Sequence, residues 1–384
     1  MAKAFASSDG LLRKAQVSCG HDAPVAALHD MLGTVSFSLL ILFVSPRADF
    51  RAIVAEAARF FPGTRVVACT TAGEIGVTGY QEGQIVAVGF PETDFSATAI
   101  AIANLETFDP VAETDRIAQE RVALQERCPD METGFAFLIV DGLSLREDML
   151  TATISPALRD LPLFGASAGD GTDFQSTFVS LNGEILESGA VLNLIRSRHR
   201  TAVFSLDHLE PTDTQMVVTD ADPERRIVKS INAEPAAREY ARLVGKDPYQ
   251  LDRFTFASHP VVVRIGENHH VRAIQQVNDS GELVFFSAID EGMVLTVARP
   301  TDMADHLRRK LRDLSADEPF TDVIGCDCIL RRIEAEQNQM TRELSDILVQ
   351  HNVAGFSTYG EQIGPLHVNQ TMTGVAFYRR DVAE

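Results

Sequence analysis

Near its C-terminus the chain reads Gly355-Phe-Ser-Thr-Tyr-Gly-Glu-Gln-Ile-Gly-Pro-Leu-His-Val-Asn-Gln-Thr-Met-Thr-Gly374. Residues 366–373 alternate in a way that predicts a strand, because successive side chains of a strand point to opposite faces. One face would carry only polar side chains, namely His367, Asn369, Thr371 and Thr373, and the other Leu366, Val368, Gln370 and Met372. Because buried polar groups without partners are costly, the polar face is predicted to meet water or a ligand.

The turn inside this stretch resembles two other short motifs in the chain. Ser357-Thr-Tyr-Gly-Glu-Gln-Ile363 resembles Thr70-Thr-Ala-Gly-Glu-Ile75, and Ala166-Ser-Ala-Gly-Asp170 is a third variant. Each follows an apolar run and offers hydroxyls, a glycine able to take positive φ, and an acid. Gene duplication and merely similar turn chemistry both explain these matches.

Predicted strands and helices alternate around these turns. Strands are predicted at 37–44, 64–69, 84–89, 96–102, 135–140 and 322–326, and helices at 50–60, 111–126, 235–244, 301–314 and 331–350. The last helix carries one apolar stripe, which favours packing against a core over a surface for a partner helix. This mixed order predicts layers of sheets and helices. The chain becomes polar around 207–226, and we place a domain boundary there, between residues 1–210 and 211–384.

Composition and charge exclude several classes of protein. The 384 residues are 45% hydrophobic and 23% charged, as in a globular protein. The net charge of −20 argues against nucleic acid and against an anionic membrane surface as partners. The longest apolar run, 37–44, is too short to cross a bilayer, and no secretory signal precedes it, so we expect a cytoplasmic protein. Its 5 scattered cysteines fit reduced thiols.

Two sets of motifs resemble one family of sensory proteins. Cys69-Thr-Thr-Ala-Gly-Glu-Ile75 and Leu163-Phe-Gly-Ala-Ser-Ala-Gly-Asp-Gly171 resemble the N-terminal FIST domain. Cys328-Ile-Leu-Arg-Arg332 with Gly355-Phe-Ser-Thr-Tyr-Gly-Glu361 resembles the C-terminal FIST domain. The resemblance covers nearly the whole chain. It implies an α+β fold of two related FIST domains with layered mixed sheets and helices, and a sensor or scaffold that binds a small ligand.

The run His367-Val-Asn-Gln-Thr371 resembles the haem-binding, nitric-oxide-sensing branch of that family. The resemblance implies haem b held by His367, nitric oxide as the signal and a histidine kinase as the partner. A neutral imidazole is a common axial ligand of sensor haems, and the absence of a Cys-x-x-Cys-His motif predicts a non-covalent haem. Tyr359, Glu361, Asn369 and Thr371 are the predicted ligand-binding residues around it. The oligomeric state stays open, with a homodimer among the alternatives.

Two alternatives come from other classes of function. The first is a haem-free module that binds a small polar metabolite through Glu361, Asn369 and Thr371. The second is a serine hydrolase, because Gly165-Ala-Ser-Ala-Gly169 matches the Gly-x-Ser-x-Gly elbow. That elbow needs a helix directly after it, and a strand is predicted instead, so we expect Ser167 to be structural and the protein not to be an enzyme.

The remaining metal-binding candidates are weaker. Cys326 and Cys328 lie at i and i+2 of a predicted strand, and a zinc site would need two further ligands that the sequence does not identify. We therefore expect buried structural thiols. His351 is predicted at the end of a helix, His269 and His270 in a turn, and His259 at a strand edge.

Overall fold

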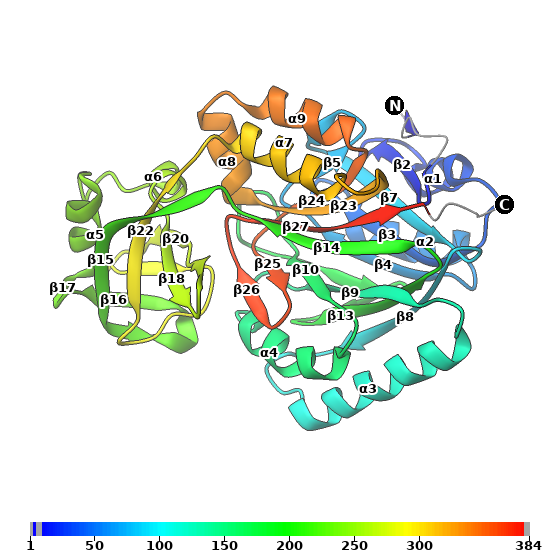
Figure 1. Ribbon diagram of the computed structural model, residues 1–384, viewed down its shortest axis with the longest axis horizontal. Helices are drawn as coiled ribbons and strands as arrows, with labels where there is room; N and C mark the ends of the chain where they lie inside the picture. The colour runs from blue at the N-terminus through cyan, green and yellow to red at the C-terminus, as the bar shows by residue number, and fades with distance from the viewer. Residues whose placement is uncertain (1–2, 5–9, 380–384) are drawn as a thin grey trace.

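The computed structural model describes residues 3–4 and 10–379 and confirms the α+β fold (Figure 1). Sheets fill the centre of the larger body, helices cover them, and a smaller body projects from one end. The strand β3 (Phe37–Val44) illustrates why the centre is all sheet. Every one of its side chains is apolar or small and buried, as expected for a strand covered on both faces.

The larger body consists of three repeats with the same order of strands, and repeat 3 has two helices, α8 and α9, where the others have one. Repeat 1 contains β2 (Arg13–Ser18), α1 (Pro24–Leu32), β3, α2 (Phe50–Phe60), β4 (Arg65–Thr70), β5 (Glu74–Gly76), β6 (Gly79–Gln81) and β7 (Gln84–Pro91). Repeat 2 contains β8 (Phe95–Ile102), α3 (Pro110–Arg127), β9 (Thr133–Val140), α4 (Glu147–Leu158), β10 (Leu163–Ser167), β11 (Val179–Leu181), β12 (Glu184–Leu186) and β13 (Ala190–Ser197). Repeat 3 contains β14 (Arg200–Leu206), α7 (Met303–Leu314), β23 (Phe320–Cys328), α8 (Ile329–Gln337), α9 (Thr341–Gln350), β24 (Val353–Thr358), β25 (Glu361–Ile363), β26 (Leu366–Val368) and β27 (Met372–Tyr378).

Each repeat builds a sheet whose last two strands come from another repeat. The strand orders are β2-β7-β3-β4-β11-β12, β8-β13-β9-β10-β25-β26 and β14-β27-β23-β24-β5-β6, and a short β1 (Lys3–Ala4) extends the first sheet. The pairs β3–β4, β9–β10 and β23–β24 are parallel. The hairpin that follows each parallel pair crosses to the neighbouring sheet. Repeat 1 therefore gives its hairpin to repeat 3, repeat 3 to repeat 2, and repeat 2 to repeat 1.

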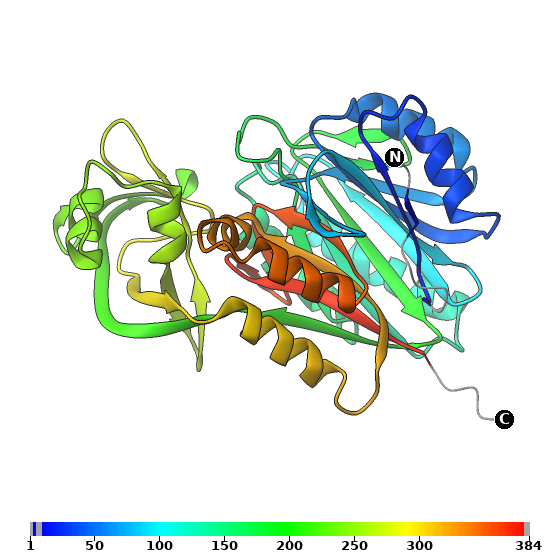
Figure 2. The same ribbon diagram turned by 90° about the horizontal axis from the view of Figure 1, so that it is seen from above.

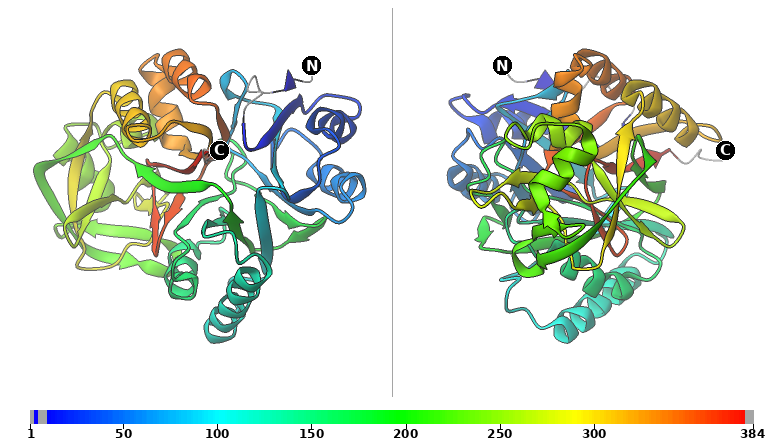
Figure 3. Two further views of the ribbon diagram at one scale, coloured as in Figure 1. Left: turned by 45° about the vertical axis from the view of Figure 1, so that its right-hand side comes forward. Right: turned by 90° about the vertical axis from the view of Figure 1, so that its left-hand side faces the viewer.

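The three sheets share one central core. Their inner faces contribute apolar side chains to a single cluster, which includes a group of phenylalanines at 90, 95, 135 and 377 in mutual edge contacts. The outer face of each sheet is covered by the helices of its own repeat, with α1 and α2, α3 and α4, and α7 to α9 on three sides (Figure 3, left). This arrangement brings the ends of β4, β10 and β24 together.

The smaller body is a domain inserted between β14 and α7. It contains β15 (Leu209–Asp222), a 3-10 turn (Pro223–Arg225), β16 (Ile227–Ile231), β17 (Glu234–Pro235), α5 (Ala236–Val244), α6 (Arg253–Ser258), β18 (Val261–Ile265), β19 (Asn268–Val271), β20 (Ile274–Val277), β21 (Leu283–Phe285) and β22 (Val294–Pro300). In Figure 2 β14 leads directly into β15, and in the right-hand view of Figure 3 the domain covers one end of the repeats. An apolar cluster joins it to α8 and to the turns before β5 and β25, so this interface is packed. The predicted boundary after residue 210 falls within β15.

Three sequence predictions differ from the structure. The predicted helix 331–350 is two helices, α8 and α9, which are separated at Gln339 with its φ of 58°. The predicted strand 366–373 is likewise two strands, β26 and β27, separated by a turn at Gln370 with a φ of 49°. Positive φ is uncommon for residues other than glycine, and a single one interrupts a regular element without changing its amphipathic pattern. His269 and His270 lie in β19, and not in a turn.

Candidate functional site

Three turns meet where β4, β10 and β24 end. We call residues 71–74 turn 1, residues 167–170 turn 2 and residues 358–361 turn 3. Ala72 N donates to Ser357 O at 2.8 Å, Ser167 N to Gly360 O at 2.8 Å, and Gly169 N to Thr70 O at 3.2 Å. Each turn is thus bonded to the strand of another repeat. The motifs that resemble one another in the sequence therefore form a structural repeat. We call turns 1, 2 and 3, which these hydrogen bonds connect, the ring.

Each turn holds its acid inside the protein. Glu74 accepts from Thr71 Oγ1 at 2.5 Å and from Gln84 N at 2.9 Å. Glu361 is bound in the same way by Thr358 Oγ1 and by Thr371, whose Oγ1 lies at 2.7 Å and whose N lies at 3.3 Å. Burial raises the pKa of Glu74 to about 7 and that of Glu361 to about 8, against the opposing effect of these donors.

Asp170 of turn 2 is bound differently. Its carboxylate accepts from three successive backbone N–H groups, those of residues 174, 175 and 176, at 2.7–2.8 Å. The hydroxyl of Tyr359 in turn 3 also donates to it, so Asp170 connects two turns. Tyr359 is buried, and burial together with the Asp170 carboxylate raises its pKa. This places Tyr359, predicted as a ligand-binding residue, in a structural contact.

His367 lies in β26, against turn 3, with 1% of its surface exposed. Burial lowers the pKa of its imidazole, which is therefore neutral. Its Nδ1 lies 3.2 Å from Nε2 of Gln362. The Nε2 atom of the imidazole itself has no hydrogen-bond partner among the described residues. The Oε1 atom of Gln362 also has no hydrogen-bond partner among the described residues. If the amide presents that oxygen to Nδ1, the ring proton lies on Nδ1 and Nε2 keeps a free lone pair, as in histidines that bind metals.

The chemistry of His367 fits an axial ligand of haem, but the packing around it does not accommodate a porphyrin. A Cβ added to Gly360 would lie 2.3 Å from Cε1 and 2.8 Å from Nε2 of His367, and 2.9 Å from Nδ2 of Asn369. The backbone of turn 3 therefore covers the edge of the ring that an iron atom would need. Among the described residues no group of three or more His, Cys, Asp and Glu side chains is placed to hold a metal ion.

The other predicted residues are bonded to the protein itself. Thr371 is bound to Glu361, and Thr373 Oγ1 donates to Gly165 O at 3.1 Å. Asn369 contacts the inserted domain, with Oδ1 3.5 Å from Ala273 N. The polar face predicted to meet water or a ligand is thus buried and meets protein groups instead.

Ser167 and the cysteines are buried as well. Ser167 Oγ lies 3.1 Å from Nε2 of Gln362, and no helix follows turn 2, so the elbow of a serine hydrolase is not formed. Cys326 and Cys328 are buried free thiols whose pKa values are raised by burial. His351 ends α9, where its Nδ1 lies 2.8 Å from Ile347 O, and His259 follows α6.

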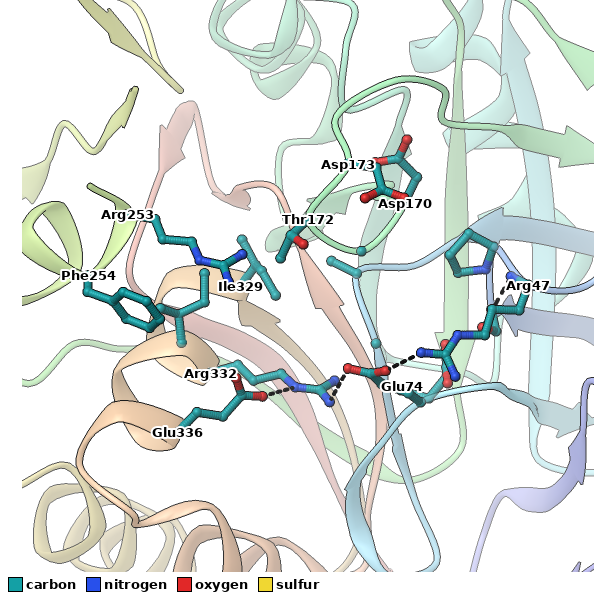
Figure 4. A pocket seen from close by; sticks show the side chains of 17 residues that line it. Arg47, Glu74, Asp170, Thr172, Asp173, Arg253, Phe254, Ile329, Arg332 and Glu336 are labelled. Atoms are coloured by element: carbon teal, nitrogen blue, oxygen red, sulfur yellow. Dashed lines mark hydrogen bonds and ion pairs between the residues drawn. The ribbon is translucent and has the colours of Figure 1, made fainter. Parts of the chain in front are cut away.

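A cavity of about 370 Å³ opens beside turn 1 (Figure 4). None of the site residues predicted from the sequence lines it. Its walls come from all three repeats and from the inserted domain, at residues 45–47, 72–74, 82, 170–173, 253–254, 329, 332, 333 and 336. The lining combines the apolar side chains of Phe254, Ile329 and Ile333 with charged ones, and α6 and α8 each contribute both kinds. Sites of this size between domains are where small ligands usually bind.

Two arginines and two acids that line the cavity form a chain of ion pairs. Arg332 on α8 is 7% exposed and contacts Glu82 and Glu336, each at 3.3 Å. Arg47, which follows β3, contacts the other oxygen of Glu82 at 2.6 Å. The sequence motif Cys328-Ile-Leu-Arg-Arg332 contained Arg332, but nothing in the sequence indicated that Arg47 and Glu82 lie beside it.

The comparison with known families agrees with this fold. Residues 38–234 match the FIST N domain and residues 236–364 match the FIST C domain. The chain therefore belongs to the FIST family. FIST domains are domains of signal transduction, which points to the sensing of small ligands. No curated protein matches the chain. In the part of the chain that the structure describes, no helix is long and apolar enough to cross a membrane.

Proposed function

We propose that the protein is a cytoplasmic sensor, and not an enzyme, whose small ligand occupies the cavity beside turn 1. The observation that carries this proposal is the composition of the cavity wall. All three repeats and the inserted domain contribute to it, and it combines apolar with charged side chains. A ligand there contacts every structural unit of the protein at once, so its binding free energy can favour one arrangement of those units over another.

The packed interface of the inserted domain suits a cavity that exists before the ligand binds. Ala72 and Tyr359 of the ring and Ile329 of α8 belong to the same apolar cluster as residues of the inserted domain. Arg226 adds one buried ion pair, with Glu147 at 2.6 Å, and one partly buried ion pair, with Asp148 at 3.2 Å. A site held open by packing requires less ordering when the ligand arrives, which favours affinity.

A screen of small metabolites by thermal stabilisation tests this proposal. Thr172 is exposed at the cavity, so Thr172→Trp should fill the entrance without disturbing the core. Thr107→Trp, in an exposed loop before α3, is the matched control. We expect at least one compound to stabilise the wild type and Thr107→Trp but not Thr172→Trp. Stabilisation that persists in Thr172→Trp would place the ligand elsewhere.

The second candidate is the haem-based nitric oxide sensor that regulates a histidine kinase. The observation favouring it is the unpartnered Nε2 of the neutral His367. This candidate requires His367 to hold a haem whose iron would bind the gas, although turn 3 covers the edge of the imidazole ring in this structure. Gln362 would orient the ring through Nδ1, and Arg272, whose Nη1 lies 3.1 Å from His367 O, would fix the backbone of β26.

An optical titration with haemin separates the two candidates. The haem candidate requires a stoichiometric Soret band in the wild type and in the control His351→Ala, and its loss or shift in His367→Ala. Addition of nitric oxide to the reduced protein should then move the band. A band that His367→Ala leaves unchanged would remove His367 as the ligand, and no specific band would remove this candidate.

A further inference from the structure

One carboxylate is held between two arginines at the cavity. Oε1 of Glu82 lies 3.3 Å from Nη2 of Arg332, and Oε2 lies 2.6 Å from Nη2 of Arg47. The two guanidiniums come from repeats 3 and 1 and use different oxygens of the same group. Arginine is favoured where an oxyanion is bound by several charge-assisted hydrogen bonds. We call Arg47 and Arg332 the arginine clamp.

Arg332 is held in place by its surroundings, whereas Glu82 and Arg47 are exposed. Arg332 is nearly buried, its Nη1 donates to Gln81 O at 3.1 Å, and it lies so close to Gly73 that a Cβ there would be 1.7 Å from Nη1. Glu82 is 54% exposed in the β6–β7 turn, and Arg47 is 65% exposed. Exposed ion pairs contribute about 0–1 kcal/mol, so another oxyanion can displace Glu82 at little cost.

A third guanidinium faces the same cavity. Arg253 of α6 points toward it in Figure 4 and forms no ion pair with the described residues. The acids that line the cavity repel a bound anion less strongly than their number suggests. Asp170 is bound by three backbone N–H groups, and the pKa of Glu74, about 7, leaves it largely protonated below neutral pH. Asp173 is exposed to water.

We propose that the arginine clamp recognises an oxyanion of the ligand, a carboxylate or a phosphate group, and that Glu82 is the internal competitor that the ligand displaces. This inference rests on the proposed ligand-binding function of the cavity and adds the chemical class of the ligand. It also gives a role to the β6–β7 turn. When the ligand displaces Glu82, the hairpin that repeat 1 lends to the sheet of repeat 3 loses one of its contacts to α8.

Calorimetric titrations with inorganic phosphate, acetate and succinate test this inference on the full chain. Glu82→Gln removes the competing charge, and Glu126→Gln, exposed on α3, is the matched control. We expect Glu82→Gln to bind at least one probe about fivefold tighter than the wild type, a change typical of one exposed ion pair. Glu126→Gln should bind like the wild type. Preference for phosphate or for the carboxylates then identifies the oxyanion.

Adding Arg47→Met to Glu82→Gln should abolish the gain, and because Arg47 is exposed this change should not disturb folding. Equal affinities in Glu82→Gln and the wild type would overturn the inference, as would a gain that survives Arg47→Met. A different result is expected if the ligand does not bind in the cavity at all. In that case Thr172→Trp leaves binding intact, whereas a wrong oxyanion assignment leaves binding sensitive to Thr172→Trp but not to Glu82→Gln.

Discussion

The buried acid of turn 3 should make the protein less stable as the pH rises. The carboxyl of Glu361 is fully buried, and burial raises its pKa to about 8 from the ordinary value of 4.5. The folded protein therefore binds the proton more tightly than the unfolded chain. A raised pKa of this kind stabilises the folded state below pH 4.5, and the contribution is lost as the pH rises through about 8.

The size of the effect follows from the pKa difference. Each pH unit well between the two pKa values costs about 1.4 kcal/mol, and the slope halves near pH 8, so a change from pH 6 to pH 8 should cost about 2 kcal/mol from this group alone. Glu361→Gln keeps the shape of the protonated carboxyl but cannot ionise. We expect the free energy of unfolding of Glu361→Gln to lack this part of the alkaline decrease.

Urea unfolding at pH 6, 7, 8 and 9 measures this difference. Glu126→Gln is the control, because its side chain is exposed and the change should leave the pH profile of the wild type intact. The reasoning is refuted if Glu361→Gln and the wild type lose stability in parallel from pH 6 to pH 9. It is equally refuted if the wild type becomes more stable over that range, since Glu361 would then be ionised in the folded protein.

Three further substitutions test the packing described above. Gly360→Ala should destabilise the protein by about 2–4 kcal/mol, because the new Cβ would overlap His367, whereas Gly20→Ala, with open space around it, should change little; urea unfolding compares them. Asp322→Ala should cost at least about 3 kcal/mol in the same assay, because it leaves Lys14 buried without its carboxylate at 2.7 Å, while Glu343→Ala, which breaks an exposed pair, should cost about 1 kcal/mol or less. Phe377→Ala should cost about 3–5 kcal/mol and lower the melting temperature, because the ring contacts three other phenylalanines in the shared core; a loss below 1 kcal/mol would contradict a single core.

The sequence was sufficient for the elements whose pattern is local. The strand 37–44 and the helix 50–60 were predicted within their observed bounds, because an unbroken apolar run and an amphipathic stripe both depend on neighbouring residues. The repeated turn was also visible. The pairing of β5 with β24 was not, since Gly355 lies opposite Ile75 and no local pattern specifies a partner so distant along the chain.

The cavity was not predicted, for the same reason, and none of the site residues predicted from the sequence lines it. His367 was predicted as a haem ligand, and its Nε2 has no hydrogen-bond partner among the described residues. Its burial, however, depends on Gly360 and on the inserted domain, which approach it from other parts of the chain. The arginine clamp was missed because Arg47 and Glu82 belong to no motif and are brought to Arg332 only by the ring of repeats.

The exchange of hairpins has a consequence for the synthesis of the protein. The hairpin β5–β6 finds its partner only when β24 has been made, nearly 280 residues later, as the pairing of Ile75 with Gly355 requires. At roughly 5–20 residues per second, a ribosome needs tens of seconds to supply that strand. Until then repeat 1 carries an unpaired edge that could pair with other chains. The chain cannot be assembled module by module from its N-terminus; closure of the ring is a late and collective event. Cutting it between its FIST N and FIST C segments should therefore yield two aggregating fragments in place of two working domains.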